Sequence, residues 1–251
     1  MKAMIFAAGL GTRLRPLTND RPKALVKVGG VVMLERVINR LKGHGIDEIV
    51  INIHHFGEKI IDFLKENNNF GINIHISDER DLLLDTGGGI LKAKEWLDGN
   101  EPIIIHNADI LTDFDLHKMV KQHIENDADA TLLVADRKTA RYFYIDDTNR
   151  LRGWTNISTG EVKPANYIAN DTDKLRAFGG VHIVSPAIFN ELKSYSNEPK
   201  FSITPFYIDK CNDLKIMGYT PTEDYKWHDI GKIESIAIAE KEFCDNININ
   251  T

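Results

Sequence analysis

An alternation of apolar runs and amphipathic segments in the first half of the chain constrains the fold most strongly. The apolar runs have the length of buried strands and cover residues 3–8, 49–53, 72–76 and 103–105. Apolar side chains at helical spacing lie between them, in residues 31–41, 59–65 and 88–97. This alternation predicts right-handed crossovers and a Rossmann-like, doubly wound, mostly parallel α/β sheet. Ligands bind such sheets at the carboxyl ends of the strands, so the residues that follow each strand are candidates for a site.

The second half of the chain is less regular. The sequence predicts strands at 127–134 and 178–184, a hairpin at 142–154, a polar loop at 156–173 and a short helix at 186–192. Neither a low-complexity linker nor an internal repeat separates the two halves. We therefore predict a single domain over residues 1–251, with one lobe of about 1–110 and a second lobe of about 111–245.

Composition excludes several classes of protein. The 31 basic and 37 acidic residues of this 251-residue chain give a formal charge of −6, and no run of five Lys or Arg residues occurs, so we expect no nucleic-acid or anionic-membrane partner. Cys211 and Cys244 are too few for a disulfide scaffold or a Cys-rich zinc site and suit a reducing cytosol. The longest early apolar run, residues 4–8, is too short for a signal-peptide core or a membrane span. We expect a cytoplasmic globular protein.

A glycine-rich loop follows the first strand. Gly9 and Gly11 leave backbone N–H groups uncovered, so a triphosphate can approach the chain closely. Arg13 offers a planar fork for phosphate oxygens, and Lys23 supplies a mobile point charge. Gly-x-Gly alone would favour a plain turn with solvated cations. A dinucleotide fingerprint requires glycine where Leu14 stands, and a Walker loop requires Gly-Lys-Ser/Thr, so neither motif fits.

The combination of Gly9-x-Gly11-Thr12-Arg13 with Pro22-Lys23 resembles the signature of sugar-1-phosphate nucleotidyltransferases, the sugar-nucleotide pyrophosphorylases. The resemblance covers nearly the whole chain. It implies the nucleotide-diphospho-sugar transferase fold, with nucleotide bound by the first lobe and sugar phosphate by the second. The implied reaction joins a nucleoside triphosphate (NTP) to a sugar 1-phosphate, giving a nucleotide sugar and pyrophosphate, with Mg²⁺ as cofactor.

The same resemblance implies roles for the residues of the loop. The triphosphate would be bound by Ala8, Gly9, Gly11, Thr12, Arg13 and Lys23. Arg13 and Lys23 would also be catalytic, because Arg13 stabilises the leaving pyrophosphate and Lys23 neutralises the reacting phosphates.

A second glycine-rich segment, Thr86-Gly87-Gly88-Gly89, precedes a predicted helix. Glycines at this place let backbone groups reach a flat base edge and ribose, although a merely flexible helix N-terminus is the alternative. The resemblance implies that Thr86, Gly87 and Gly88 bind the nucleotide. The surrounding pattern is similar to the branch that contains N-acetylmuramic acid 1-phosphate uridylyltransferases and mannose-1-phosphate guanylyltransferase-like proteins.

Two aspartates are candidate metal ligands. Asp109 ends an apolar strand, where a carboxylate suits Mg²⁺, which prefers one or two carboxylates plus substrate phosphates. A solvated aspartate or a helix cap is the alternative, although Asp113 and Asp115 are better caps for a helix from Leu116.

The resemblance adds a second ligand to this site. Asp229, in Trp227-His228-Asp229-Ile230-Gly231, is similar to the family's second acidic ligand, although Lys232 replaces the usual threonine. The family also has glycine where Ala108 stands, and Asn107 would hold the nucleotide or position the metal. The resemblance thus implies that Asp109 and Asp229 meet in the fold.

The sequence contains no complete motif for a sugar-binding site. By position in the resembled fold it would be lined by Arg141, Asn156, Lys163 and Gly180. Many relatives have Glu-Lys-Pro after the strand where residues 153–156 stand. We interpret Trp154 and Phe178 as core residues.

The substrates stay open at this point. UTP with an N-acetylated sugar such as N-acetylmuramic acid 1-phosphate is the first choice, which would place the enzyme in cell-wall sugar metabolism. The alternatives are a guanylyltransferase for mannose or heptose 1-phosphate, a cytidylyltransferase for phosphocholine, and a catalytically silent nucleotide-sugar sensor. An NAD-dependent oxidoreductase is disfavoured by Leu14. The oligomeric state is not predicted.

Overall fold

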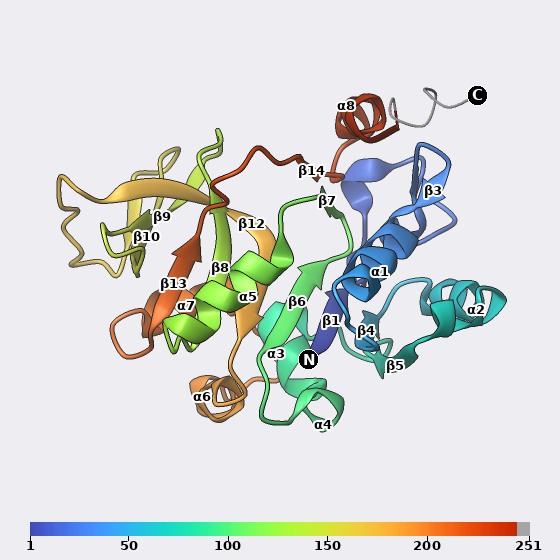
Figure 1. Ribbon diagram of the computed structural model, residues 1–251, viewed down its shortest axis with the longest axis horizontal. Coiled ribbons are helices and arrows are strands. Elements are labelled where there is room, and N and C mark those ends of the chain that lie inside the picture. The colour runs from blue at the N-terminus through green and yellow to red at the C-terminus, as the bar shows by residue number, and fades with distance from the viewer. Residues whose placement is uncertain (245–251) are drawn as a thin grey trace.

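A ten-stranded sheet runs through the centre of the computed structural model, which describes residues 1–244 (Figure 1). Eight strands follow one another in the order β11-β10-β9-β12-β6-β1-β4-β5, β8 pairs with β12, and β13 pairs with β8. The first half contributes β1 Lys2–Phe6, β4 Glu48–Ile53, β5 Asn73–Asp78 and β6 Ile103–Asn107, all paired in parallel. The second half contributes β8 Ala130–Ala135, β9 Arg141–Ile145, β10 Leu151–Asn156, β11 Glu161–Lys163, β12 Lys174–Val184 and β13 Ile216–Tyr219. The predicted α/β fold with a parallel sheet at its centre is confirmed, and β9 to β12 extend it with antiparallel pairs.

Helices cover both faces of the sheet (Figure 1). Ala3 and Ile5 of β1 pack on one side, in a cluster with apolar side chains of α1 Met33–Gly43, α2 Gly57–Glu66 and α5 Leu116–Glu125. Met4 packs on the other side, with side chains of α3 Asp85–Lys92, α4 Lys94–Leu97, α6 Ile188–Tyr195 and α7 Ile203–Lys210. Successive strand residues point to opposite faces, so a strand covered on both sides is apolar throughout, as β1 is. Within residues 1–244, no helix has the length and apolar character needed to cross a membrane.

Several boundaries differ from the sequence predictions. β8 begins at Ala130 rather than at 127, because Asp127 has a left-handed backbone (φ 46°) in the turn after α5. The predicted loop at 156–173 contains β11, and β12 begins at Lys174 rather than at 178. Long-range pairing with neighbouring strands orders these polar residues, and local apolar patterning does not report such pairing.

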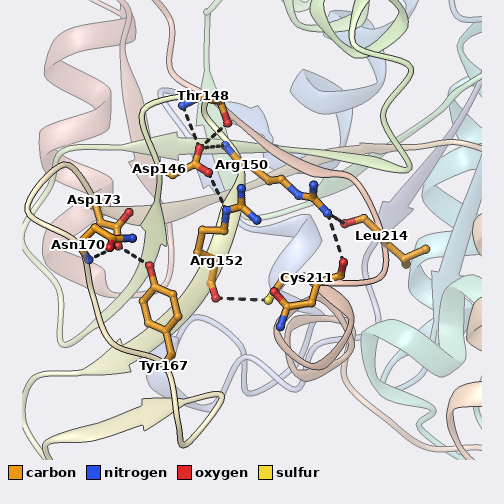
Figure 2. Close-up of polar contacts among 10 residues, drawn as sticks. Asp146, Thr148, Arg150, Arg152, Tyr167, Asn170, Asp173, Cys211 and Leu214 are labelled. Atoms are coloured by element: carbon orange, nitrogen blue, oxygen red, sulfur yellow. Dashed lines mark hydrogen bonds and ion pairs between the residues drawn. The ribbon is translucent and has the colours of Figure 1, made fainter.

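The predicted hairpin is confirmed by the antiparallel pairing of β9 and β10. Asp146 holds its turn, because one carboxylate oxygen accepts hydrogen bonds from the backbone N–H and hydroxyl of Thr148 and from the N–H of Arg150 (Figure 2). The other oxygen accepts from Arg152 Nε at 2.6 Å. The hairpin carries Arg141, one of the predicted sugar-site residues, at the start of β9.

Two strand pairings bring distant segments to one edge of the molecule. Phe6 at the end of β1 is paired with Asn107 at the end of β6, so the loop from Ala7 and the segment around Asp109 leave the sheet side by side. Beyond β6, the short strand β7 Ile110–Thr112 pairs with β14 Trp227–Asp229 (Figure 1). The remaining elements are β2 Lys27–Val28, β3 Val31–Val32, α8 Ile233–Cys244, and the 3-10 helices Thr12–Leu14, Lys23–Leu25 and Asn68–Gly71.

Candidate active site

One lysine and two aspartates meet at the edge where β1 and β6 end. Lys23 Nζ forms an ion pair with Asp109 Oδ2 and lies 3.9 Å from Asp229 Oδ1. The β7–β14 pairing brings the two aspartates together, because the Ile230 N–H donates a 2.8 Å hydrogen bond to the Asp109 carbonyl. The Lys23 side chain is only 14% exposed, so solvent screens its charge weakly. The sequence-predicted cation and the two predicted carboxylates therefore share one place.

Burial destabilises the charged form of the Asp229 carboxylate. Burial raises its pKa and the neighbouring Asp109 charge raises it further, while Lys23, Arg13 and Arg137 act in the opposite direction. Within the described part of the chain, Asp229 Oδ1 is buried and accepts no hydrogen bond.

Two carboxylates with an unsatisfied oxygen fit a divalent cation that prefers oxygen ligands. No group of three or more His, Cys, Asp or Glu side chains in residues 1–244 has a metal-binding arrangement. A cation at this pair would therefore complete its coordination with water or substrate oxygens, as Mg²⁺ commonly does.

A cleft of about 370 Å³ opens beside this triad. Of the predicted nucleotide-binding residues, it is lined by Ala8, Gly9, Lys23, Thr86 and Asn107, and it is also lined by Asp109. The other three predicted loop residues are not among its lining residues: these are Gly11, Thr12 and Arg13.

Gly11 instead allows the loop to fold back over Lys23. Its backbone is left-handed (φ 64°), and its carbonyl accepts a 2.8 Å hydrogen bond from Thr18 Oγ1. A Cβ at Gly11 would lie 3.1 Å from Lys23 Cβ. Arg13 Nη2 is close to the segment that follows Asp229, since a Cβ at Gly231 would lie 3.1 Å from it.

Asn52 is a site residue that the sequence analysis missed. Its side-chain oxygen accepts hydrogen bonds from the N–H groups of Ala7 and Ala8, at 2.8 and 3.3 Å. Its amide nitrogen donates to Glu79 Oε1 at 2.8 Å, and Asn52 lines the cleft. The signal was a single polar residue inside the apolar run 49–53, where a buried amide requires hydrogen-bond partners.

The structure gives Gly87 and Gly88 a different place from the predicted one. Their N–H groups both donate to the Phe201 carbonyl, at 2.9 and 3.1 Å, and neither residue lines the cleft. A Cβ at Gly87 would overlap the Phe201 ring, and one at Gly88 would overlap the Pro199 carbonyl oxygen. The glycines thus permit close packing of the 199–201 segment against α3, so their backbone donors are not free for a base as the sequence analysis supposed.

Replacing Gly88 with alanine is therefore expected to lower the free energy of unfolding by roughly 1–3 kcal/mol, because the added methyl group overpacks a backbone contact. Chemical denaturation monitored by circular dichroism measures this change. Gly99→Ala is the matched control, since a Cβ there meets nothing within 4 Å. Equal stability of the two variants would show that the 199–201 contact is readily displaced.

A second pocket of about 540 Å³ is lined by two of the predicted sugar-site residues, Arg141 and Lys163. The other two do not line it. Asn156 accepts a hydrogen bond from the Ser158 N–H in the turn after β10. Gly180 has a left-handed backbone (φ 73°), and a Cβ there would lie 2.7 Å from Ile110 Cγ1 and 3.1 Å from Asn107 Nδ2. Gly180 therefore lets β12 pass close to the end of β6.

Two aromatic residues that we interpreted as core pack against a core cluster and also face the second pocket. Trp154 and Phe178 both line it, and both are only partly buried. Arg137, which the sequence analysis did not select, lines the same pocket. Its position in the β8–β9 loop carried no motif that would have distinguished it from other surface arginines.

The fold and the meeting of Lys23, Asp109 and Asp229 define a Rossmann-like α/β protein with one cation and two carboxylates gathered where its central strands end. The Nucleotidyl transferase family profile matches residues 2–246, and the chain belongs to this family. The predicted resemblance to these enzymes is therefore confirmed at the level of the family.

Particular relatives include uridylyltransferases and guanylyltransferases. The chain is 30% identical over 254 residues to an N-acetylmuramate alpha-1-phosphate uridylyltransferase of Caulobacter vibrioides, with 97% of each chain covered. It is 29% identical over 247 residues to a UTP--glucose-1-phosphate uridylyltransferase of Synechocystis, which covers 93% of this chain and 61% of the relative. It is 28% identical over 257 residues to mannose-1-phosphate guanylyltransferase 1 of Arabidopsis thaliana, which covers 98% of this chain and 66% of the relative. The chain thus spans less than two thirds of the length of the last two relatives.

Solved structures share the fold. HddC from Yersinia pseudotuberculosis superposes with a TM-score of 0.77 at 22% identity, covering 96% of this chain and 99% of that one. A UDP-glucose pyrophosphorylase complexed with UDP-glucose superposes with a TM-score of 0.75 at 17% identity, covering 98% of both chains. These structures support the nucleotide-diphospho-sugar transferase fold.

Proposed function

We propose that the protein transfers a nucleotidyl group from an NTP to a sugar 1-phosphate in a Mg²⁺-dependent reaction. A sugar-phosphate oxygen attacks the α-phosphorus, the bond from the α-phosphorus to the bridging oxygen breaks, and pyrophosphate leaves with that oxygen. The nucleophile is already anionic, so no general base is required. The meeting of Lys23 with Asp109 and Asp229 beside the glycine-loop cleft is the observation that carries this proposal.

Charge neutralisation and positioning would account for catalysis. Asp109 and Asp229 would hold Mg²⁺, which supplies positive charge to the reacting phosphates when bound. Lys23 would move from its ion pair with Asp109 to a phosphate oxygen. Arg13, close to the Asp229 segment, would stabilise the leaving pyrophosphate together with the backbone of Gly11 and Thr12.

The nucleotide would occupy the 370 Å³ cleft and the acceptor sugar the 540 Å³ pocket. Ala8, Gly9, Thr86 and Asn107 are our candidates for nucleotide contacts, and Arg141 and Lys163 for sugar contacts. The cleft is also lined by Phe6, Ala7 and Asp109, which lie at or just beyond the carboxyl ends of β1 and β6. Ligands bind parallel sheets at these strand ends, so this position suits a nucleotide.

UTP with N-acetylmuramic acid 1-phosphate is our first proposed pair. It is supported by the 30% identity to the Caulobacter uridylyltransferase over 97% of both chains. This pair would place the enzyme in cytoplasmic cell-wall sugar metabolism. A guanylyltransferase for mannose 1-phosphate is the second candidate, which the Arabidopsis relative supports.

A matrix of UTP, GTP, CTP and dTTP against a panel of sugar 1-phosphates, measured by pyrophosphate release, tests this proposal. We expect the highest kcat/KM for UTP with N-acetylmuramic acid 1-phosphate, and loss of turnover in EDTA that added Mg²⁺ restores. The panel includes glucose, mannose, heptose and N-acetylglucosamine 1-phosphates, with phosphocholine beside them. Binding of nucleotide sugars without any pyrophosphate release would instead identify a silent sensor.

A further inference from the structure

Arg137, which lines the second pocket, is held by contacts with two strands. It lies in the loop between β8 and β9, and its guanidinium carbon is 4.2 Å from the centre of the Trp227 ring. Its Nη2 donates a 2.6 Å hydrogen bond to the Phe178 carbonyl. The Trp227 indole N–H in turn donates to the Gly179 carbonyl at 2.8 Å. Two contacts from β12 and β14 therefore hold the guanidinium in place.

The same side chain lines the second pocket and packs on the strand that carries Asp229. Arg137 lines the 540 Å³ pocket with Arg141, Trp154 and Phe178. Burial lowers the pKa of Arg137, and the charge of Asp229 opposes this effect. Asp229 lies two residues beyond Trp227 on β14, the strand that supports the guanidinium. Residues two apart on a strand share a face, so Arg137, which packs on the Trp227 ring, lies on the face of β14 that carries Asp229, and it also lines the pocket.

The guanidinium of Arg137 has no carboxylate in direct contact among the described residues. In residues 1–244, Arg137 forms no ion pair within 4.0 Å, and Nη2 is its only nitrogen with a hydrogen-bond partner. Arg152 and Arg176 of this lobe do have carboxylate partners, Asp146 at 2.6 Å and Asp136 at 3.7 Å, whereas Arg150 has hydrogen bonds to carbonyl oxygens. A half-buried cation without a counter-ion is costly, and an anionic ligand in the adjacent pocket would offset that cost.

We propose that Arg137 binds the phosphate group of the acceptor sugar 1-phosphate and aims it at the nucleotide. This proposal rests on the proposed function, because it assigns one residue to the acceptor of that reaction. In the proposed reaction the sugar ring occupies the second pocket, while its phosphate group must extend toward Asp229, where the nucleotide would bind. A planar guanidinium can donate two parallel hydrogen bonds to phosphate oxygens, which a lysine cannot do. Sequence patterns around the glycine loop and the aspartates do not point to this residue.

Arg137→Met tests the proposal, with Lys138→Met as the matched control that removes the same charge from an exposed neighbour outside the pocket. Kinetics are measured with the most active pair from the substrate matrix. We expect Arg137→Met to raise KM for the sugar 1-phosphate roughly thirtyfold, the effect of losing hydrogen bonds to a charged group. KM for the NTP is expected to change less than about twofold, and Lys138→Met to change neither value.

Calorimetric titration measures the difference in affinity between phosphorylated and unphosphorylated sugars. A purely structural role of Arg137 would not change this difference. The probes are N-acetylmuramic acid 1-phosphate, glucose 1-phosphate, and the two parent sugars without phosphate. Wild-type protein is expected to prefer each phosphorylated sugar over its parent, and Arg137→Met to lose that preference while it binds the parents unchanged. Arg137→Lys, which keeps the charge but not the fork, is expected to retain part of the preference.

The proposal is overturned if Arg137→Met leaves both the sugar-phosphate KM and the phosphate preference unchanged, or weakens phosphorylated and parent sugars equally. If thermal melting shows that Arg137→Met does not fold, Arg137→Lys decides by the same comparison. A wild-type protein that binds sugar phosphates without releasing pyrophosphate from any pair contradicts the proposed function. A preference for phosphate that depended on Arg137 would still support the binding role in that case.

Discussion

Asp109→Asn is expected to lower kcat by roughly a hundredfold or more, because it removes one of the two carboxylates that would hold the metal. The substitution keeps the size of the side chain, and Asp109 is partly exposed, so the folded structure should persist. Steady-state pyrophosphate release measures the loss, and thermal unfolding confirms that the variant is folded. The activity loss should persist at saturating substrate.

Asp115→Asn is the control for this variant. Asp115 also carries a carboxylate close in sequence, but it caps α5 by accepting a 2.9 Å hydrogen bond from the His117 N–H. Asparagine caps helices about as well as aspartate, so this variant should keep both stability and turnover. Near-wild-type kinetics for Asp109→Asn would remove Asp109 from the mechanism.

Lys23→Met is expected to change two properties in opposite directions. Turnover should fall by roughly a hundredfold, because a cation that neutralises the reacting phosphates is lost. Divalent-metal binding without nucleotide should tighten by roughly tenfold, because Lys23 no longer competes for the two carboxylates. A tenfold change is about 1.4 kcal/mol, well below the roughly 4 kcal/mol Coulomb energy of unit charges 4 Å apart near a protein surface.

Calorimetry with Mn²⁺ measures the second effect, and Lys27→Met, at an exposed position of β2, controls for the change in net charge. Weaker metal binding in Lys23→Met than in Lys27→Met would show that the carboxylates do not form a metal site when the lysine leaves. Reduced turnover together with tighter metal binding would separate the role of Lys23 from that of the aspartates.

The sequence alone predicts those features of the site that depend on residues adjacent in the chain. The apolar run before Gly9 predicts a buried strand that ends at a loop, and the run before Asp109 places a carboxylate at the end of a neighbouring strand. Both predictions depend on residues adjacent in the chain, and β1 and β6 do pair side by side. Gly11 and Lys23, which the motif groups together, are also neighbours in the fold, since a Cβ at Gly11 would lie 3.1 Å from Lys23 Cβ.

The other features of the site depend on packing between segments that are far apart in the sequence. Asp229 joins Asp109 through the pairing of β7 with β14, and Gly87 and Gly88 face the 199–201 segment instead of the cleft. Arg137 is distinguished from other arginines only by its contact with the Trp227 ring and its place in the lining of the second pocket. Patterns along the chain report the strand period and the turn residues, because those arise from neighbouring residues. Which group a glycine N–H or a guanidinium meets depends on contacts between residues far apart in sequence, so only the folded chain determines it.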